Sequence, residues 1–202
     1  MFTSRLIRFF LPLLLACTAV GLLPACSQGE SAGTGAIDVT GADYARDFRL
    51  QDTGGAWRTL ADYRGKVVMV FFGFTQCPDI CPGAMTQAAE VLQRLGDDGR
   101  RVQVLFISLD PERDTPEILH AFVSTFHPSF VALRGDPALT QQTAESYRVF
   151  YRKVPAGGSY TIDHSALVYV YDKDGQLRRA LRPGMTAEQQ IEQIRPFLSP
   201  PV

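Results

Sequence analysis

Cysteine and histidine are scarce in this chain of 202 residues, which contains four cysteines and three histidines. So few cysteines exclude a small fold that is held together by many disulfides. Basic residues are in no excess either, because Lys and Arg number 20 against 21 for Asp and Glu, and this excludes the positive surface of a nucleic-acid-binding protein. After the N-terminal segment the sequence has no heptads, no internal repeats and no long apolar helical span, so one globular domain is expected.

The N-terminal segment, residues 1–25, has the composition of a secretory signal rather than of a membrane anchor. Arg5 and Arg8 precede an almost wholly apolar run, residues 9–23, and small or turn-forming residues follow it. A signal of this kind directs the domain that follows out of the cytoplasm. We therefore expect the protein in the cell envelope, on the periplasmic side.

A cysteine stands at the end of this segment. The sequence LLPAC, 22–26, resembles a bacterial lipobox, whose cysteine, here Cys26, becomes the lipidated first residue of the mature protein and attaches it to the membrane. Pro24 is unusual in this motif, and the upstream sequence LLLAC around Cys17 is a competing site. A plain cleaved signal and an uncleaved anchor remain the alternatives. Residues 26–43 are rich in Gly, Ser and Ala and are expected to form a flexible tether.

The remaining residues, 44–202, are expected to form one domain in which strand and helix patterns alternate. The run VVMVFFGF, for example, is continuously apolar, which is typical of a strand buried on both faces. The alternation indicates an α/β three-layer sandwich with a central mixed β-sheet and an N-terminal β-hairpin, and the order fits a thioredoxin-like fold of the peroxiredoxin-like variant. The expected strands are 67–74, 101–110, 130–135 and 164–172, the hairpins are 47–60 and 164–181, and the helices are 82–95, 115–126, 136–147 and 185–198.

Cys77 and Cys81 lie four residues apart in the sequence FTQCPDICP, where an apolar strand ends and a helix begins. Residues at this spacing on a first helical turn share one face, with Cα atoms roughly 6 Å apart, so the pair suits a structural disulfide, a redox dithiol or half of a metal site. A disulfide that closes so short a loop adds little stability, which argues against the first of these. The positive end of the helix is expected to lower the pKa of both thiols.

The histidines of the domain differ in their settings. His120 falls among apolar residues of the 115–126 helix, so we expect it to be half-buried by packing, and His127 follows that helix, where its ring can pair with the last carbonyls. His164 stands at a loop–strand junction beside Asp163, a carboxylate able to orient a metal-binding ring or accept its proton. From spacing alone, a metal ligand and an ordinary strand-start residue explain His164 equally well.

Three sequence blocks, in this order along the chain, resemble those of the Sco (SenC/PrrC) family, copper-binding proteins that serve cytochrome c oxidase assembly. They are FTQCPDICP, SLDPERDTPEIL (108–119) and TIDHSALVYVYDKDG (161–175). The resemblance implies a thioredoxin-like fold and one copper ion, Cu(I) or Cu(II), held by Cys77, Cys81 and His164, with Asp163 tuning the site. The N-terminus, which resembles a lipobox, differs from that of many relatives, which have a membrane helix at this place.

The function that this resemblance implies is a copper metallochaperone for the binuclear CuA site of cytochrome c oxidase. Its partner would be the copper-receiving subunit of the oxidase or another copper protein. The alternative is a thiol–disulfide oxidoreductase that reduces the cysteines of the receiving subunit, but this leaves His164 without a role, and the usual motif has two residues between its cysteines instead of three. A peroxidase is a third possibility, against which Thr75 lies one residue too close to Cys77 for the T-x-x-C pattern of that class.

A charged loop is expected at the same rim of the domain. Asp110, Arg113 and Asp114 belong to the second of the three blocks and precede the 115–126 helix. They would either order the site or contact a partner. An ordinary role in capping the helix and forming ion pairs explains them equally well.

Overall fold

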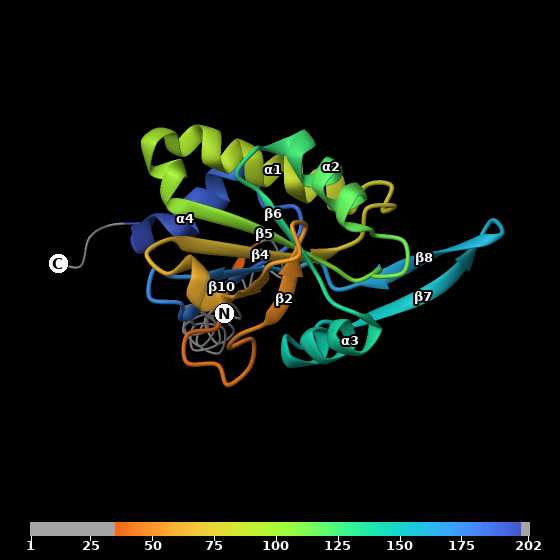
Figure 1. Ribbon diagram of the computed structural model, residues 1–202. Helices are drawn as coiled ribbons and strands as arrows, with labels where there is room; N and C mark the ends of the chain where they lie inside the picture. The colour runs from red at the N-terminus through yellow and green to blue at the C-terminus, as the bar shows by residue number, and fades with distance from the viewer. Residues whose placement is uncertain (1–34, 199–202) are drawn as a thin grey trace, which may run out of the picture. The chain divides into compact units, whose positions relative to one another are not determined.

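The computed structural model describes residues 35–198 of the chain. The predicted secretory signal, the lipidation site Cys26 and the first part of the predicted tether lie outside these residues. The described part is a central β-sheet with helices on both faces (Figure 1). The predicted thioredoxin-like sandwich, with its mixed sheet and N-terminal hairpin, is confirmed.

The centre of the fold is an eight-stranded mixed sheet in the order β1-β10-β9-β4-β5-β6-β2-β3. Strands β4 (Val67–Gly73) and β5 (Val102–Ser108) pair in parallel along their whole length, and every residue of both is buried. Burial on both faces suits the apolar sequence of β4 and most of β5. The two polar residues of β5 are buried with hydrogen-bond partners, Gln103 at the carbonyl of Ser129 and Ser108 at the carboxylate of Asp114. The other strands of this sheet are β1 (Ala36–Asp38), β2 (Arg49–Asp52), β3 (Trp57–Thr59), β6 (Val131–Arg134), β9 (Val168–Tyr171) and β10 (Leu177–Leu181).

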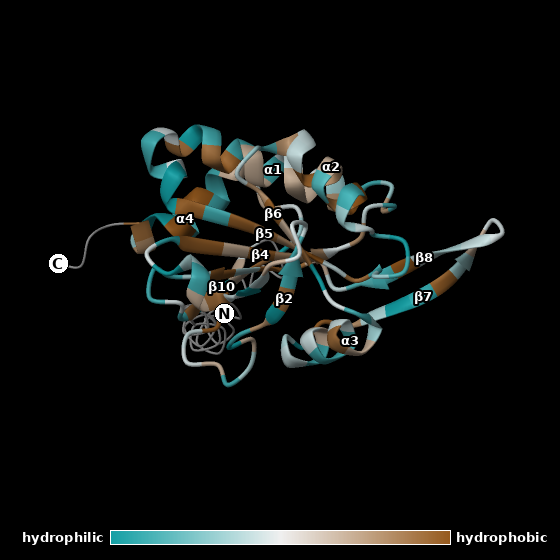
Figure 2. Ribbon diagram, viewed as in Figure 1, coloured by the Kyte–Doolittle hydropathy of each residue, from teal (hydrophilic) through white to brown (hydrophobic). Residues whose placement is uncertain are grey.

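Two layers cover the sheet, and successive residues of β4 point alternately into them. Met69 and Phe71 pack in a core beneath α1, α2 and α4, whereas Val70 and Phe72 pack in a second core on the opposite face, which α3 covers (Figure 1). Figure 2 shows β4 and β5 in brown, between helices that carry both brown and teal residues. The helices are α1 (Ile80–Leu95), α2 (Pro116–Phe126), α3 (Pro137–Ser146) and α4 (Ala187–Leu198), and the 3₁₀ helices are η1 (Leu60–Tyr63) and η2 (Gly96–Arg101).

Polar side chains fix where α2 and α3 begin. The side chains of Thr115 and Asp136 accept hydrogen bonds from the backbone N–H groups of Ile118 and Leu139, as expected of N-caps. Helix α1 ends at Gly96, whose φ of +57° favours glycine. Within residues 35–198, none of the helices has the length and apolar character needed to cross a bilayer.

Three segments differ from the sequence-based expectations. The strand expected at 164–172 begins only at Val168, and His164 instead ends the preceding strand, β8 (Ser159–His164). The expected tether is wrong at its end, because Ala36–Asp38 forms β1 and pairs antiparallel with β10. A second sheet, formed by β7 (Tyr151–Ala156) and β8 (Ser159–His164), was not expected. Its two-residue turn consists of glycines with positive φ, as type I′ hairpins require. Figure 1 shows this hairpin extending away from the main sheet.

Candidate metal centre

Strand pairing brings a histidine to the cysteine pair from 83 residues along the chain. Strand β9 runs antiparallel to β4, with Val168 opposite Phe71. The start of β9 therefore lies beside the end of β4. Cys77 and Cys81 follow the end of β4, and His164 shortly precedes the start of β9. The topology of the sheet alone thus places these segments at one edge.

The two cysteines occupy different positions relative to helix α1. Cys81 lies in its first turn and is fully buried, whereas Cys77 lies in the loop before it and is half-buried. The expectation that both share a helical turn is wrong, because α1 begins only at Ile80. Instead, the Sγ of Cys77 accepts a hydrogen bond from the backbone N–H of Cys81, with nitrogen and sulfur 3.3 Å apart, and so lies at the positive end of the helix. Both residues are free cysteines.

Three potential ligand atoms converge at this point. The sulfur atoms of Cys77 and Cys81 and a ring nitrogen of His164 all lie within 4.8 Å of one another, and the Nε2 of His164 is 3.6 Å from the Sγ of Cys81. Metal bonds of roughly 2.0 to 2.3 Å, as zinc makes to imidazole and thiolate, place two donors on one ion roughly 3.5 to 3.8 Å apart. The three donor atoms therefore need to move only a little to bind the same ion. Thiolate and imidazole favour copper or zinc over magnesium or calcium.

The ring of His164 is oriented for metal binding. Its Nδ1 lies 2.9 Å from the carbonyl oxygen of Ser165, and only a protonated nitrogen can donate to that oxygen, so the lone pair is on Nε2, which faces the sulfur of Cys81. The ring packs edge-on against Phe71 and Phe74, at centroid distances of 6.1 and 5.9 Å. Burial lowers the pKa of His164 below its ordinary value, which favours the neutral, metal-binding form.

Burial also controls the acidity of Cys81. It raises the pKa of the thiol far above its ordinary value, although a hydrogen bond to the backbone at Phe74 acts in the opposite direction. The expectation of a lowered pKa for both thiols is therefore wrong for Cys81, because desolvation outweighs the field of the helix end. Cys81 remains a protonated thiol at neutral pH until its proton is removed by a reaction or a metal.

Asp163 does not form the expected hydrogen bond with the ring. Successive residues of β8 point to opposite sides, so Asp163 faces away from the side on which His164 lies. Its carboxylate pairs instead with Arg152 across the hairpin, at 2.9 Å, and is exposed. The ring bonds to the Ser165 carbonyl, and Asp163 acts on His164 only through its charge, which raises the pKa of the imidazole slightly against the larger effect of burial.

The charged loop after β5 orders the segment that carries the cysteines. Asp114 is fully buried, and its carboxylate accepts hydrogen bonds from the hydroxyl groups of Thr75 and Ser108, both at 2.6 Å. Asp110 is also fully buried and pairs with Arg113 at 2.5 Å. Burial prevents both acids from contacting a partner. Of the roles left open by the sequence, the contacts support two: Asp110 and Arg113 form an ordinary ion pair, and Asp114 orders the segment of Thr75.

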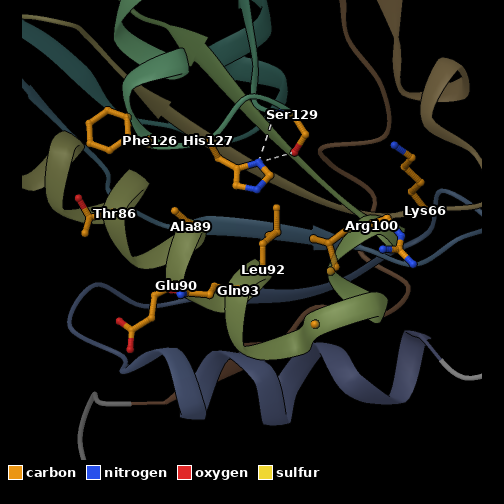
Figure 3. Close-up of a pocket in the computed structure, with 13 residues that line it drawn as sticks. Lys66, Thr86, Ala89, Glu90, Leu92, Gln93, Arg100, Phe126, His127 and Ser129 are labelled. Atoms are coloured by element: carbon orange, nitrogen blue, oxygen red, sulfur yellow. Dashed lines mark hydrogen bonds between the residues drawn. The ribbon is translucent and has the colours of Figure 1, made fainter.

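The other two histidines lie outside the site. His120 is exposed on α2, so the expectation of a half-buried ring is wrong, because its position falls on the outer face of the helix. The expectation that the ring of His127 bonds the last carbonyls of the helix is wrong. Its Nδ1 lies 2.8 Å from the hydroxyl oxygen of Ser129, as the dashed lines in Figure 3 show.

The open hollow of about 790 Å³ that Figure 3 shows lies at the other end of the central strands. It is bordered by Lys66, just before β4, and by Val102, the first residue of β5. Its cationic groups already have partners, since Lys66 bonds to Gln103 at 3.3 Å and Arg100 pairs with Asp97 at 2.9 Å. The group of potential metal ligands found among the described residues is instead the cysteine–histidine cluster, which is the better candidate site.

Gly73 is a residue of the site that none of the sequence motifs identifies. A Cβ at this position would lie 2.8 Å from the Sγ of Cys81 and 2.9 and 3.0 Å from ring atoms of Phe106 and Phe71. The buried sulfur therefore occupies space that exists only because residue 73 has no side chain. The signal in the sequence is a glycine near the end of an otherwise apolar strand, which marks a close approach of other atoms.

We expect Gly73→Ala to lower the free energy of unfolding by about 1 to 3 kcal/mol, the usual effect of an extra methyl group in a packed core. Gly83→Ala in α1 is the matched control, because its new Cβ would meet nothing within 4 Å. That change should raise the free energy of unfolding by up to about 1 kcal/mol through helix propensity. Urea denaturation measures both, and equal effects would show that Gly73 has no special packing role.

Comparisons with known proteins assign the chain to a family. The family model described as SCO1/SenC matches residues 38–199. The mitochondrial SCO2 homolog of Bos taurus is 39% identical over 153 residues, which are 74% of this chain and 58% of that protein. The chain therefore matches less than two thirds of the length of that relative. The SCO2-like protein of Rickettsia prowazekii is 32% identical over 148 residues, 72% of each chain.

Solved structures show the same architecture. The structure of Bradyrhizobium japonicum ScoI with copper bound is similar at a TM-score of 0.68 and 39% identity, over 75% of this chain and 97% of that one. Yeast Sco1 with copper bound is similar at a TM-score of 0.69 and 33% identity, over 77% and 88% of the two chains. The family match spans most of the chain, including all three converging residues, and the chain belongs to the SCO1/SenC family.

Proposed function

We propose that this protein binds one copper ion through Cys77, Cys81 and His164 and carries it for the assembly of cytochrome c oxidase, with the CuA site as its destination. The supporting observation is the convergence of three suitable donors within 4.8 Å. Two relatives of known structure, from Bradyrhizobium japonicum and yeast, have copper bound. The receiving partner is the copper-binding subunit of the oxidase or another copper protein.

The donors suit the two oxidation states of copper differently. Cu(I) is a soft ion that two thiolates hold well, whereas Cu(II) favours nitrogen and oxygen ligands and depends more strongly on the imidazole. His164 therefore contributes most to the binding of Cu(II). Its neutral, desolvated ring needs no proton loss to act as a ligand.

Release of copper begins at the more accessible sulfur. Cys81 is fully buried, whereas Cys77 is half-buried and precedes the helix. A ligand of the partner therefore replaces Cys77 first, and the ion transfers as further ligands follow. Oxidation of the two thiols to a disulfide, with two electrons passed to an external acceptor, would remove both sulfur donors and eject the ion.

A thiol–disulfide reductase is the second candidate function. The observation in its favour is that the two cysteines are free and adjacent in the structure. This function needs no third residue, whereas copper binding needs His164. Substitution of His164 therefore separates the two functions.

We expect His164→Ala to weaken Cu(II) binding by more than the roughly 100-fold that marks the upper range for outer-shell changes, because it removes a ligand. Cu(I) binding should fall much less. Competition with chelators of known affinity, together with the sulfur-to-copper charge-transfer band, measures this loss. His127→Ala is the control, since that ring lies outside the site, and unchanged Cu(II) affinity in His164→Ala would remove His164 from the copper site.

Binding of Cu(I) should release a proton from Cys81 at every pH between 6 and 8. Burial raises the pKa of this thiol, so the proton is present throughout this range and competes with the metal. Affinity should therefore rise with pH by at least about tenfold per unit, because Cys81 alone contributes one proton. Calorimetry in buffers of different ionisation enthalpy counts the protons. An affinity that is independent of pH would mean that the sulfur is already ionised.

We also propose that Cys26 carries a lipid that holds the protein to the membrane on the periplasmic side. The support is the lipobox-like sequence LLPAC at the end of an apolar segment. Protein isolated from membranes should then begin at Cys26 and have the added mass of the acyl groups. Intact-mass analysis tests this, with Cys26→Ala as the control. A mature protein without added mass would favour a plain cleaved signal.

A further inference from the structure

The hairpin of β7 and β8 depends on contacts outside itself for its position. In the described part of the chain its strands pair only with each other. A two-stranded hairpin is at best marginally stable on its own. At its base, the backbone N–H of Ser165 donates to the carbonyl of Phe150 at 2.9 Å. Because His164 is the last residue of β8, whatever holds this strand also holds the ring.

Arg113 connects this hairpin to the cysteine loop. Its Nη1 donates to the backbone carbonyl of Tyr160 on β8, at 2.8 Å, and to the Oε1 of Gln76, at 3.1 Å. Gln76 directly precedes Cys77. The Nε of Arg113 pairs with the carboxylate of Asp110, at 2.5 Å. One guanidinium group thus contacts the segment of one copper ligand, the strand of another, and the loop after β5.

Burial makes this connection more costly to break than a surface ion pair, because removing one partner leaves the other charge buried and unpaired. The side chain of Asp110 is 0% exposed and that of Arg113 is 16% exposed. The guanidinium carbon lies 3.6 Å from the centre of the Tyr160 ring, and the Tyr160 hydroxyl donates to the second oxygen of Asp110 at 2.7 Å. A planar guanidinium can stack and bond several acceptors at once, which the ammonium group of lysine cannot do.

Strand β8 connects the contacts of Tyr160 to the ring of His164. Tyr160 and His164 are four residues apart on β8 and therefore share one side of the strand, roughly 13 Å from each other. Ile162 lies between them on that side and is buried in the core against which Cys77 packs. Fixing Tyr160 against the domain therefore fixes the side of β8 that presents His164.

From these contacts we propose that Arg113 is a positioning residue for the copper site. It holds β8 against the cysteine loop, so that the ring of His164 stays at the distance from the sulfurs that a shared ion requires. Arg113 is not itself a ligand, since its contacts are with Gln76, Tyr160, Ser159 and Asp110. The inference rests on the proposed function. It implies that loss of Arg113 weakens the binding of Cu(II) more than the binding of Cu(I), because Cu(II) depends more on the imidazole.

A double-mutant cycle of Arg113→Gln and His164→Ala tests this role. Arg113→Gln alone should weaken Cu(II) binding about 10- to 100-fold, the range known for residues that orient metal ligands, while Cu(I) binding changes less than about threefold. In the His164→Ala background, Arg113→Gln should have almost no further effect on Cu(II), because the ring through which it acts is gone. Chelator competition measures each affinity.

Three further variants keep the test decisive. Arg58→Gln removes an arginine that pairs with Asp52 at 2.7 Å on the far edge of the sheet, and should change neither affinity. Arg113→Lys keeps a cation beside Asp110 and should recover part of the Cu(II) affinity. Tyr160→Phe removes only the hydroxyl bond to Asp110 and replaces Arg113→Gln if that variant does not fold. It should weaken Cu(II) binding by a smaller factor, and again weaken Cu(II) binding more than Cu(I) binding.

A readout without copper separates this inference from the proposed function. In the metal-free protein, the NMR signals of the His164 ring report its edge-on contacts with Phe71 and Phe74. Arg113→Gln should shift and broaden these signals, and Arg58→Gln should not. Equal losses for Cu(I) and Cu(II), a full effect in the His164→Ala background, or an unchanged ring spectrum would overturn the positioning role. Failure of the wild-type protein to bind copper would overturn the proposed function and the copper selectivity inferred from it, whereas the effect of Arg113 on the ring of His164 would still be decided by the NMR spectra.

Discussion

The antiparallel pairing of β9 with β4 is the constraint on which the site depends. Because β5 runs parallel to β4 and β9 runs against it, the end of β4 meets the start of β9 and the loop after β5 at one edge of the sheet. The cysteines, the histidine and the loop of Asp110 to Asp114 come from these three segments. A register shift of one residue would turn the side chains of a strand to the opposite face and dissolve this arrangement.

Desolvation gives the site its chemical character. It raises the pKa of Cys81 and lowers the pKa of His164, so both groups favour their neutral forms in the metal-free protein. A soft cation that displaces the thiol proton then binds a buried sulfur, and water competes little with that sulfur for the cation. The half-buried Cys77 is the less enclosed of the two sulfurs, so the site combines one protected ligand with one that a partner can reach. That asymmetry is consistent with the proposed function, in which the ion is first bound and then transferred to a partner.

Local patterns in the sequence predict most of the fold and only part of the site. The apolar runs and the caps at Thr115 and Asp136 identify the central strands and the helices, because these signals depend on neighbouring residues alone. The short strand β1 and the strands β7 and β8 lack such signals, since few of their residues are buried, but the Gly157–Gly158 pair is a local hairpin-turn signal that the sequence does contain. The acidity of Cys81 and the direction of Asp163 depend on burial and strand facing, which local patterns do not report.

The buried cluster around Arg113 bears on which chemistry the site performs. Removing a carboxylate such as Asp110 from water costs several kcal/mol before pairing offsets it, so a buried ion pair is weak evidence for added stability. Its contacts instead define a geometry: they join the cysteine loop to the strand that ends in His164. An imidazole whose free Nε2 faces a protonated thiol at 3.6 Å can also act as a base for that thiol, so its position alone does not decide between a metal site and a redox pair. What favours a metal site over a bare redox pair is that two sulfurs and an imidazole nitrogen all lie within 4.8 Å of one another.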